Sequence, residues 1–464
     1  MRLPSGAPLT TPAVYRGRVY VSGGFRSKEL YALDARTGQG AWGLDLDDDG
    51  PSAPACAEGV CAINTESCTL FVVDAATGAP RWSWWLGDPL TSAPAIADGR
   101  VFASYPVSGL GSPQQAASAN ATANANANPA PPGAFHPAPS PVAGDAAPGA
   151  SPLPASPSQR RRPPGMTHAL AAFDLATGRI LWQVWLDSDV LSAPAVYGAH
   201  VYATSFAGTL YELEAATGRV VSARRVRATS APVVDAGGRL HLTQRVDRPG
   251  EAAAEAVVAG PSAGAPAWVS PSKAAPYLDA AVQASSGLAS QAAGNDAANG
   301  FAGGAPAAAN PGAALNNIGQ GNVFSMQAFQ GSRVLATQAG LVNTMGDEVR
   351  CADTHTGAPR WSLRLEGDLR RVGGFLAAPP ALAGGRLIIA THAGEVLEVE
   401  PTSGKVLRRH AVGHPVRSQP VIDAGWIYVG TDDGYLVGID TGDPTLTGWA
   451  QWGGDAARTG RPAP

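Results

Sequence analysis

The chain has 464 residues, 45% of them hydrophobic and only 15% charged, so it can bury a large core and bulk disorder is excluded. The formal charge is −4 and lysine occurs at only three positions, Lys28, Lys273 and Lys405, which argues against nucleic acid as a partner. No apolar run reaches the roughly 18 residues of a membrane span, so we expect no transmembrane segment. The first residues of the chain as given lack the apolar stretch of a signal peptide.

A repeated unit dominates the chain from its first strands onward. An apolar strand leads into Asp-x-x-Thr-Gly, and a tryptophan lies four residues after the glycine. The clear copies are Leu30–Trp42, Leu70–Trp82, Leu170–Trp182 and Val349–Trp361, and the degenerate copies are Leu210–Ser222, Val396–Arg408 and Leu436–Pro444. Self-similarity of this kind indicates a repeat architecture.

A second anchor, Ser-Ala-Pro, starts ten residues after each of the first three tryptophans and returns at Ser230–Pro232. A two-strand hairpin pattern follows each anchor, as in Val196–Thr204 and Val421–Gly430. The alternation of apolar and polar residues with glycine-centred turns is typical of strands, and no helical period competes with it.

Each unit therefore supplies four short antiparallel strands, which cannot bury both faces alone. Stacking such sheets around an axis solves this problem and limits exposed edges. We predict an all-β, eight-bladed β-propeller that spans residues 1–464 as a single domain. One of the eight units begins at Ser230, includes the hairpin Arg239–Arg245 and lacks the Asp-x-x-Thr-Gly turn. Seven blades is the alternative, if that unit and the one ending at Trp361 share a sheet.

Two segments interrupt the period. Residues 106–166 are rich in Ala, Pro, Ser and Asn and lack Trp, Tyr and Ile, so we expect a disordered insertion. Residues 248–323 are rich in Ala and Gly but keep Trp268 and Tyr277, so we expect a partly ordered insertion. The remainder gives about 41 residues per unit, which agrees with a four-stranded blade.

The recurring residues have structural roles in this interpretation. In the turns, Asp and Thr bond the local backbone and Gly supplies a positive φ. The tryptophans recur at one strand position, where an indole can wedge between neighbouring blades while its N–H finds a carbonyl. We therefore assign blade docking, and no ligand role, to Trp42, Trp82, Trp182 and Trp361.

The combination of A-x-D-x-x-T-G-x-x-x-W with S-A-P resembles the PQQ-like, quinoprotein-type β-propeller repeat family. The resemblance covers the chain outside the two insertions. It implies one of two functional classes: quinoprotein dehydrogenases, with PQQ and calcium on the propeller axis, or a non-catalytic, BamB-like branch that binds proteins. The segment Trp449–Gly460 is similar to one that usually precedes the first blade in such proteins. Here it follows the last blade, and this departure predicts a truncated or rearranged N-terminus.

Several residues are candidates for functional sites. The dehydrogenases carry two adjacent cysteines over the cofactor, and no such pair occurs here, so we expect no catalytic, cofactor-binding or metal-binding residues. If Glu58-Gly59 forms a hairpin turn, Cys56 faces Cys61 across the ladder. The pair then forms a disulfide, which needs an oxidising compartment, or two small buried thiols.

Trp85 and Trp185 each follow a docking tryptophan by three residues, so strand alternation places them on the opposite face of consecutive blades. Aromatic residues are enriched at protein interfaces, and we treat this pair as a candidate interaction patch; the alternative is that other parts of the blades cover both rings.

We therefore predict that the protein is a non-catalytic scaffold for protein–protein interaction, and envelope assembly is one specific version of this function. We expect the protein to be monomeric. The resemblance places it in the periplasm or outside the cell. The alternatives are a PQQ-dependent quinoprotein dehydrogenase with calcium, and a propeller that binds a sugar or small ligand at one mouth of the axial channel.

Overall fold

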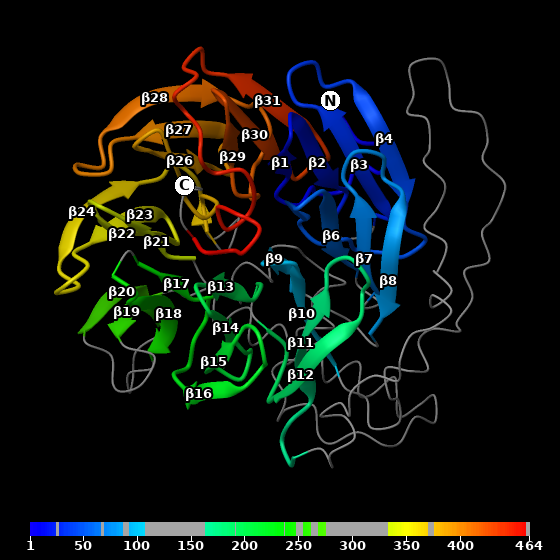
Figure 1. Cartoon of the computed structure of the whole chain (residues 1–464). Coiled ribbons are helices and arrows are strands. Elements are labelled where there is room, and N and C mark those ends of the chain that lie inside the picture. Colours follow the sequence, from blue (N-terminus) through cyan, green and yellow to red (C-terminus); the bar gives the residue numbers. More distant parts are fainter. Residues whose placement is uncertain are drawn as a thin grey trace, which may run out of the picture.

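A computed structural model describes residues 1–24, 27–65, 69–86, 92–106, 163–190, 192–235, 237–246, 254–260, 268–274, 333–369 and 375–460. Every named element in these ranges is a β-strand. The strands form eight antiparallel sheets that follow one another around a central axis (Figure 1). The structure confirms an eight-bladed β-propeller, and the seven-bladed alternative was wrong because the unit at Ser230 and the unit ending at Trp361 form separate sheets.

The first four blades follow the repeat in chain order, and the innermost strand is the first of each. Blade 1 is β1 (Ala13–Tyr15), β2 (Arg18–Ser22), β3 (Glu29–Asp34) and β4 (Gly40–Asp45); blade 2 is β5 (Ala55–Ala57), β6 (Val60–Asn64), β7 (Thr69–Asp74) and β8 (Pro80–Trp85). Blade 3 is β9 (Ala95–Ala97), β10 (Arg100–Pro106), β11 (His168–Asp174) and β12 (Ile180–Leu186); blade 4 is β13 (Ala195–Tyr197), β14 (His200–Thr204), β15 (Thr209–Glu214) and β16 (Val220–Arg225).

The other four blades continue the ring. Blade 5 is β17 (Val233–Val234), β18 (Leu240–Val246), β19 (Ala254–Gly260) and β20 (Trp268–Ala274); blade 6 is β21 (Leu335–Thr337), β22 (Gly340–Met345), β23 (Glu348–Ala352) and β24 (Pro359–Arg364). Blade 7 is β25 (Ala381–Ala383), β26 (Arg386–Ala390), β27 (Glu395–Val399) and β28 (Val406–Ala411); blade 8 is β29 (Val421–Asp423), β30 (Trp426–Gly430) and β31 (Leu436–Asp440).

The two insertions fall differently in this architecture. The first joins β10 to β11 within blade 3, and its residues 107–162 lie outside the described residues. The second range, 248–323, contains β19 and β20, which belong to blade 5; residues 248–253, 261–267 and 275–323 lie outside the described residues.

In blade 8 the N-terminal residues of the chain lie at the outer edge of the sheet, whereas the repeat pattern predicts four strands from one unit. Its sheet has three strands, and Arg2 bridges Tyr435 at the edge of β31. Two hydrogen bonds of 2.8 Å link Met1 and Leu436: the N-terminal amino group of Met1 donates to the Leu436 carbonyl, and the Leu436 backbone N–H donates to the Met1 carbonyl. Residues that lead into blade 1 thus complete blade 8, which closes the ring.

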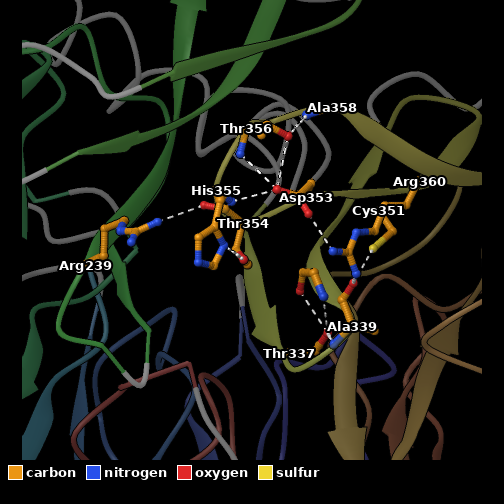
Figure 2. A network of polar contacts seen from close by, with 11 residues as sticks. Arg239, Thr337, Ala339, Cys351, Asp353, Thr354, His355, Thr356, Ala358 and Arg360 are labelled. Carbon is orange, nitrogen blue, oxygen red and sulfur yellow. Dashed lines mark hydrogen bonds and ion pairs between the residues drawn. The ribbon is translucent and has the colours of Figure 1, made fainter.

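Figure 2 shows the Asp-x-x-Thr-Gly turn of blade 6. One carboxylate oxygen of Asp353 accepts bonds from the backbone N–H groups of His355 and Thr356, both at 2.9 Å, and from the Thr356 hydroxyl at 3.0 Å. The Arg360 guanidinium, together with these N–H groups, holds the pKa of Asp353 well below its usual range. The ionised aspartate therefore serves as the local cap that fixes the turn.

Blades dock through the recurring tryptophans. Each indole N–H donates to a backbone carbonyl in the turn of the next blade, three residues before its glycine. The four bonds are Trp42 to Ala75 at 3.1 Å, Trp82 to Leu175 at 2.8 Å, Trp182 to Ala215 at 2.9 Å and Trp361 to Pro401 at 2.8 Å. The turn glycine lies directly against the ring: a Cβ on Gly178, whose φ is +69°, would come within 2.7 Å of the Trp82 indole. The glycine thus meets two needs at once, a left-handed backbone and close approach of the ring.

Candidate functional site

The axis of the propeller is crossed by the C-terminal segment 449–460, which we call the axial segment. The inner edge of each first strand carries backbone groups that no other strand of the blade pairs. The axial segment satisfies these groups blade after blade, at the middle residue of each inner strand. Its carbonyls accept bonds from Ile422 (2.7 Å), Val14 (2.6 Å), Ile96 (2.7 Å) and Val196 (2.8 Å), in blades 8, 1, 3 and 4.

In blade 2 a side chain takes the place of this backbone pairing. The Gln451 amide oxygen accepts the Cys56 N–H at 2.8 Å, and its amide nitrogen donates to the Cys56 carbonyl at 3.1 Å. Cys56 pairs directly with Cys61 across β5 and β6, and the two are joined in a disulfide. Both cysteines are buried. The disulfide therefore lies on the axial side of blade 2, beside the axial segment.

Arg458 fastens the axial segment to the inner strands. Its side chain is fully buried, and its guanidinium donates to three carbonyls: Pro94 at 3.1 Å, Trp452 at 2.5 Å and Ala53 at 3.2 Å. Ala53 and Pro94 belong to the Ser-Ala-Pro anchors of blades 2 and 3. A second buried cation, Arg333, donates to the Arg458 carbonyl at 2.5 Å. Burial lowers the pKa of Arg458 to about 9 and that of Arg333 to about 10, so both remain charged at neutral pH.

The candidate interaction patch lies on the rim, on the outermost strands of blades 2 and 3. Trp85 is 48% exposed at the end of β8, whereas Trp185 on β12 is half-buried and has a partner. Between Trp82 and Trp85, Trp84 donates its N–H to the Gly178 carbonyl of blade 3 at 2.7 Å. Trp82 and Trp84 thus face blade 3, and strand alternation directs Trp85 away from that seam.

A pocket of about 770 Å³ opens where the turns of blades 1, 2 and 3 meet. Its lining combines apolar residues such as Tyr20, Val60 and Leu175 with charged residues of both signs: Arg16, Arg18, Arg81, Glu58, Asp74 and Asp174. Arg81 is engaged with Asp74 at 2.6 Å, and Arg18 donates to the Ala75 carbonyl at 3.3 Å. The pocket is a recess between blades with a mixed polar and apolar lining, of the kind that can contact a partner.

The geometry agrees with sequence comparison. The family described as outer membrane protein assembly factor BamB, a PQQ-type repeat family, matches residues 26–122, 146–345 and 345–463. The chain belongs to this family. No curated protein sequence is significantly similar to the chain.

Several solved structures are similar to this BamB-family propeller, and the first two below have its fold. BamB from Moraxella catarrhalis is 14% identical, with a TM-score of 0.52, and the alignment covers 94% of this chain and 95% of that one. The computationally designed Ika8 protein is 12% identical, with a TM-score of 0.55 and coverage of 93% and 96%. The quinohemoprotein alcohol dehydrogenase from Comamonas testosteroni is 12% identical, with a TM-score of 0.49 and coverage of 90% and 69%.

The resemblance to quinoprotein dehydrogenases implies an adjacent cysteine pair over a cofactor on the axis, and the described axial residues can be compared with that expectation. The axial segment crosses the axis, and the disulfide joins cysteines five positions apart rather than adjacent ones. Within the described ranges, no group of three or more His, Cys, Asp and Glu side chains is placed to hold a metal ion. The same ranges contain no helix long and apolar enough to cross a bilayer.

Sequence reasoning placed the docking tryptophans and the cysteine pair, but it missed the axial segment as a structural element. The motif Trp449–Gly460 was visible, yet its partners lie far away in sequence: Gln451 bonds Cys56 across 395 positions. Arg333 was also missed. Arg333 lies two residues before the inner strand of blade 6. Blades 2 to 5 have alanine at the same position, so aligning the blades on the first residue of each inner strand would have revealed the arginine.

Proposed function

We propose that this BamB-family propeller is a non-catalytic scaffold that binds other proteins in the cell envelope, with outer membrane protein assembly as its specific setting. The observation that carries the proposal is the axial segment. Because residues 449–460 bond the inner strands of blades 8, 1, 2, 3 and 4, the chain itself covers the axis there. The turns, the inter-blade pocket and the rim are left for partners.

The outer surface offers contacts of the type found in protein interfaces. Trp85 is 48% exposed on the rim, and the pocket between blades 1, 2 and 3 presents arginines beside carboxylates. Tryptophan and arginine are the residues most enriched among those that dominate binding energy. The Cys56–Cys61 disulfide supports a place in the periplasm or outside the cell, since disulfides persist in oxidising compartments.

Site-specific photo-cross-linking in cells, followed by identification of the partner, tests this function. A photoreactive residue at Trp85 is expected to capture a defined component of the outer-membrane assembly apparatus. The matched control is Leu407, which is 51% exposed on β28 in blade 7, on another part of the rim. Equal capture at both positions, or capture of no envelope component from any position on blades 1 to 3, would contradict the proposal.

The alternative function is a PQQ-dependent dehydrogenase. Equilibrium dialysis of the whole protein against PQQ with calcium, followed by a dye-linked alcohol oxidation assay, separates the two. The scaffold proposal predicts no stoichiometric binding and no turnover. Binding with turnover would replace the scaffold by the enzyme.

A further inference from the structure

Arg333 occupies an unusual position near the axis. The corresponding residue, two before the inner strand, is Ala53, Ala93, Ala193 and Ala231 in blades 2 to 5. The Arg333 guanidinium lies 4.4 Å from the centroid of the Trp452 ring, and a Cβ on Gly453 would come within 3.2 Å of its Nη1 and Nη2 atoms. Gly453 therefore has no side chain that would crowd the Arg333 guanidinium.

The donors of Arg333 are only partly satisfied. The residue is 5% exposed, and Nη2 donates to the Arg458 carbonyl at 2.5 Å. Its Nε and Nη1 groups have no hydrogen-bond partner, although both are buried. A buried donor without an acceptor has lost its bonds to water with no compensation, and the loss is greater when the group is charged, so such donors require an acceptor.

The charge of this pair is also incompletely balanced. Arg458 lies 5.3 Å from the same Trp452 ring, and its donors are all directed at backbone carbonyls, which carry no net charge. Asp455 is the carboxylate that acts on both arginines, but it forms no ion pair within 4 Å with either. Its two oxygens accept from the Thr459 N–H at 3.0 Å and the Thr459 hydroxyl at 2.6 Å. Within the part of the chain that the structure describes, the two buried cations thus share one carboxylate, which forms no ion pair with either.

Burying a charge without a counter-charge is strongly unfavourable. Arginine is the side chain best suited to bind carboxylate or phosphate oxygens, because its planar guanidinium presents several N–H groups. We propose that Arg333, supported by Arg458 on the Trp452 ring, forms an anion-binding site at the axis, which takes a small oxyanion, a carboxylate or a phosphate, on the free Nε and Nη1 donors. The oxyanion supplies both the missing acceptors and the missing negative charge. The site is independent of partner binding on the rim.

Thermal unfolding of the full chain with added anions tests this site. Sodium phosphate and sodium acetate are titrated separately against sodium chloride at equal ionic strength. At a tenfold excess over Kd, either oxyanion is expected to raise Tm by about 2 °C. A phosphate response identifies phosphate chemistry, and an acetate response identifies a carboxylate. No rise with either anion would overturn the proposal.

Variants locate the response. Arg333→Met keeps the length of the side chain, removes the donors and is expected to abolish the shift. Arg364→Met is the control, because the Arg364 side chain is 84% exposed on β24, and it should keep the full shift. An equal shift in both variants would show that anions bind elsewhere and would overturn the proposal.

A second measurement does not depend on folding of the variant. Crystals of the wild-type protein grown with selenate are expected to show an anomalous peak for selenium beside Arg333, placed so that a selenate oxygen lies within hydrogen-bond distance of the Nε or Nη1 atom. Water alone at that position, with selenate bound elsewhere in the same crystal, would contradict the site.

Discussion

We call the contact between two neighbouring blades a seam. The three seams that join blades 1 to 2, 2 to 3 and 3 to 4 differ from the seam between blades 5 and 6. In each of the first three seams, an indole covers the turn glycine of the next blade and bonds a carbonyl three residues earlier. Between blades 5 and 6 the same carbonyl position, Thr354, accepts a bond from Arg239 at 3.1 Å (Figure 2). The buried apolar cluster there contains only Val257, Val334 and Leu341 among the described residues. These seams use the same carbonyl position with different donors, and donors can combine: in the first seam Arg18 at 3.3 Å and Tyr20 at 2.9 Å bond Ala75 together with Trp42.

The seam that closes the ring makes the same point. Tyr428 of blade 8 donates its hydroxyl at 2.9 Å to the carbonyl of Ala35, three residues before the turn glycine of blade 1. That glycine, Gly38, has φ +69° but no neighbour within 4 Å of its Cβ position. A phenol thus supplies the hydrogen bond without covering the glycine, so the bond and the ring packing are separable contributions.

The largest expected effect comes from removing an indole. Trp182 is 8% exposed, packs near Phe102 and bonds Ala215. Trp182→Ala is expected to lower the free energy of unfolding by about 3–5 kcal/mol, because it leaves a cavity and an unsatisfied carbonyl. Urea denaturation measures the change.

The control for that substitution is Trp85→Ala, at the exposed rim position. It is expected to change the free energy of unfolding by about 0.5 kcal/mol or less. Similar losses for the two variants would mean that the seam contributes no more than the surface.

The disulfide is expected to contribute the next largest effect. Replacing both Cys56 and Cys61 by alanine opens a loop closed by residues five positions apart, for which chain entropy gives about 2 kcal/mol. The loss should be equal to that caused by reduction of the wild-type protein with dithiothreitol. If reduction leaves the urea midpoint unchanged, the disulfide does not stabilise blade 2.

The closing seam is expected to depend moderately on its phenol. Tyr428→Phe removes the bond to Ala35 and keeps the ring, so it should cost about 1 kcal/mol. Tyr15→Phe is a matched control, because its hydroxyl accepts a bond from Gly59 at 3.0 Å in a partly exposed site. A loss no larger than in that control would show that the closing bond is dispensable.

The smallest effect is expected at the seam between blades 5 and 6. Arg239→Gln removes the bond to Thr354, which lies in a partly exposed turn, and should cost about 0.5–1 kcal/mol. The same urea titration measures it. A loss as large as that of Trp182→Ala would contradict the distinction between the seams.

Much of this architecture could be predicted from the sequence because the repeat is local. The spacing of Asp, Gly and Trp within one unit specified the turn, the strand and the side of the blade on which Trp42 or Trp182 lies. The path of the axial segment could not be predicted, because residues such as Gln451 and Arg458 meet partners hundreds of positions away and follow no period. The completion of blade 8 by Met1–Leu3 is long-range in the same way.

The most direct test of the docking account is a double-mutant cycle on one seam. Gly178→Ala and Gly38→Ala both place alanine at φ +69°, but only the Gly178 Cβ would collide with an indole, that of Trp82 at 2.7 Å. Gly178→Ala should therefore cost about 1–3 kcal/mol more than Gly38→Ala in the wild-type chain. In a Trp82→Ala background, this difference is expected to vanish; an undiminished difference would show that the glycine is not needed for the indole and would contradict the account.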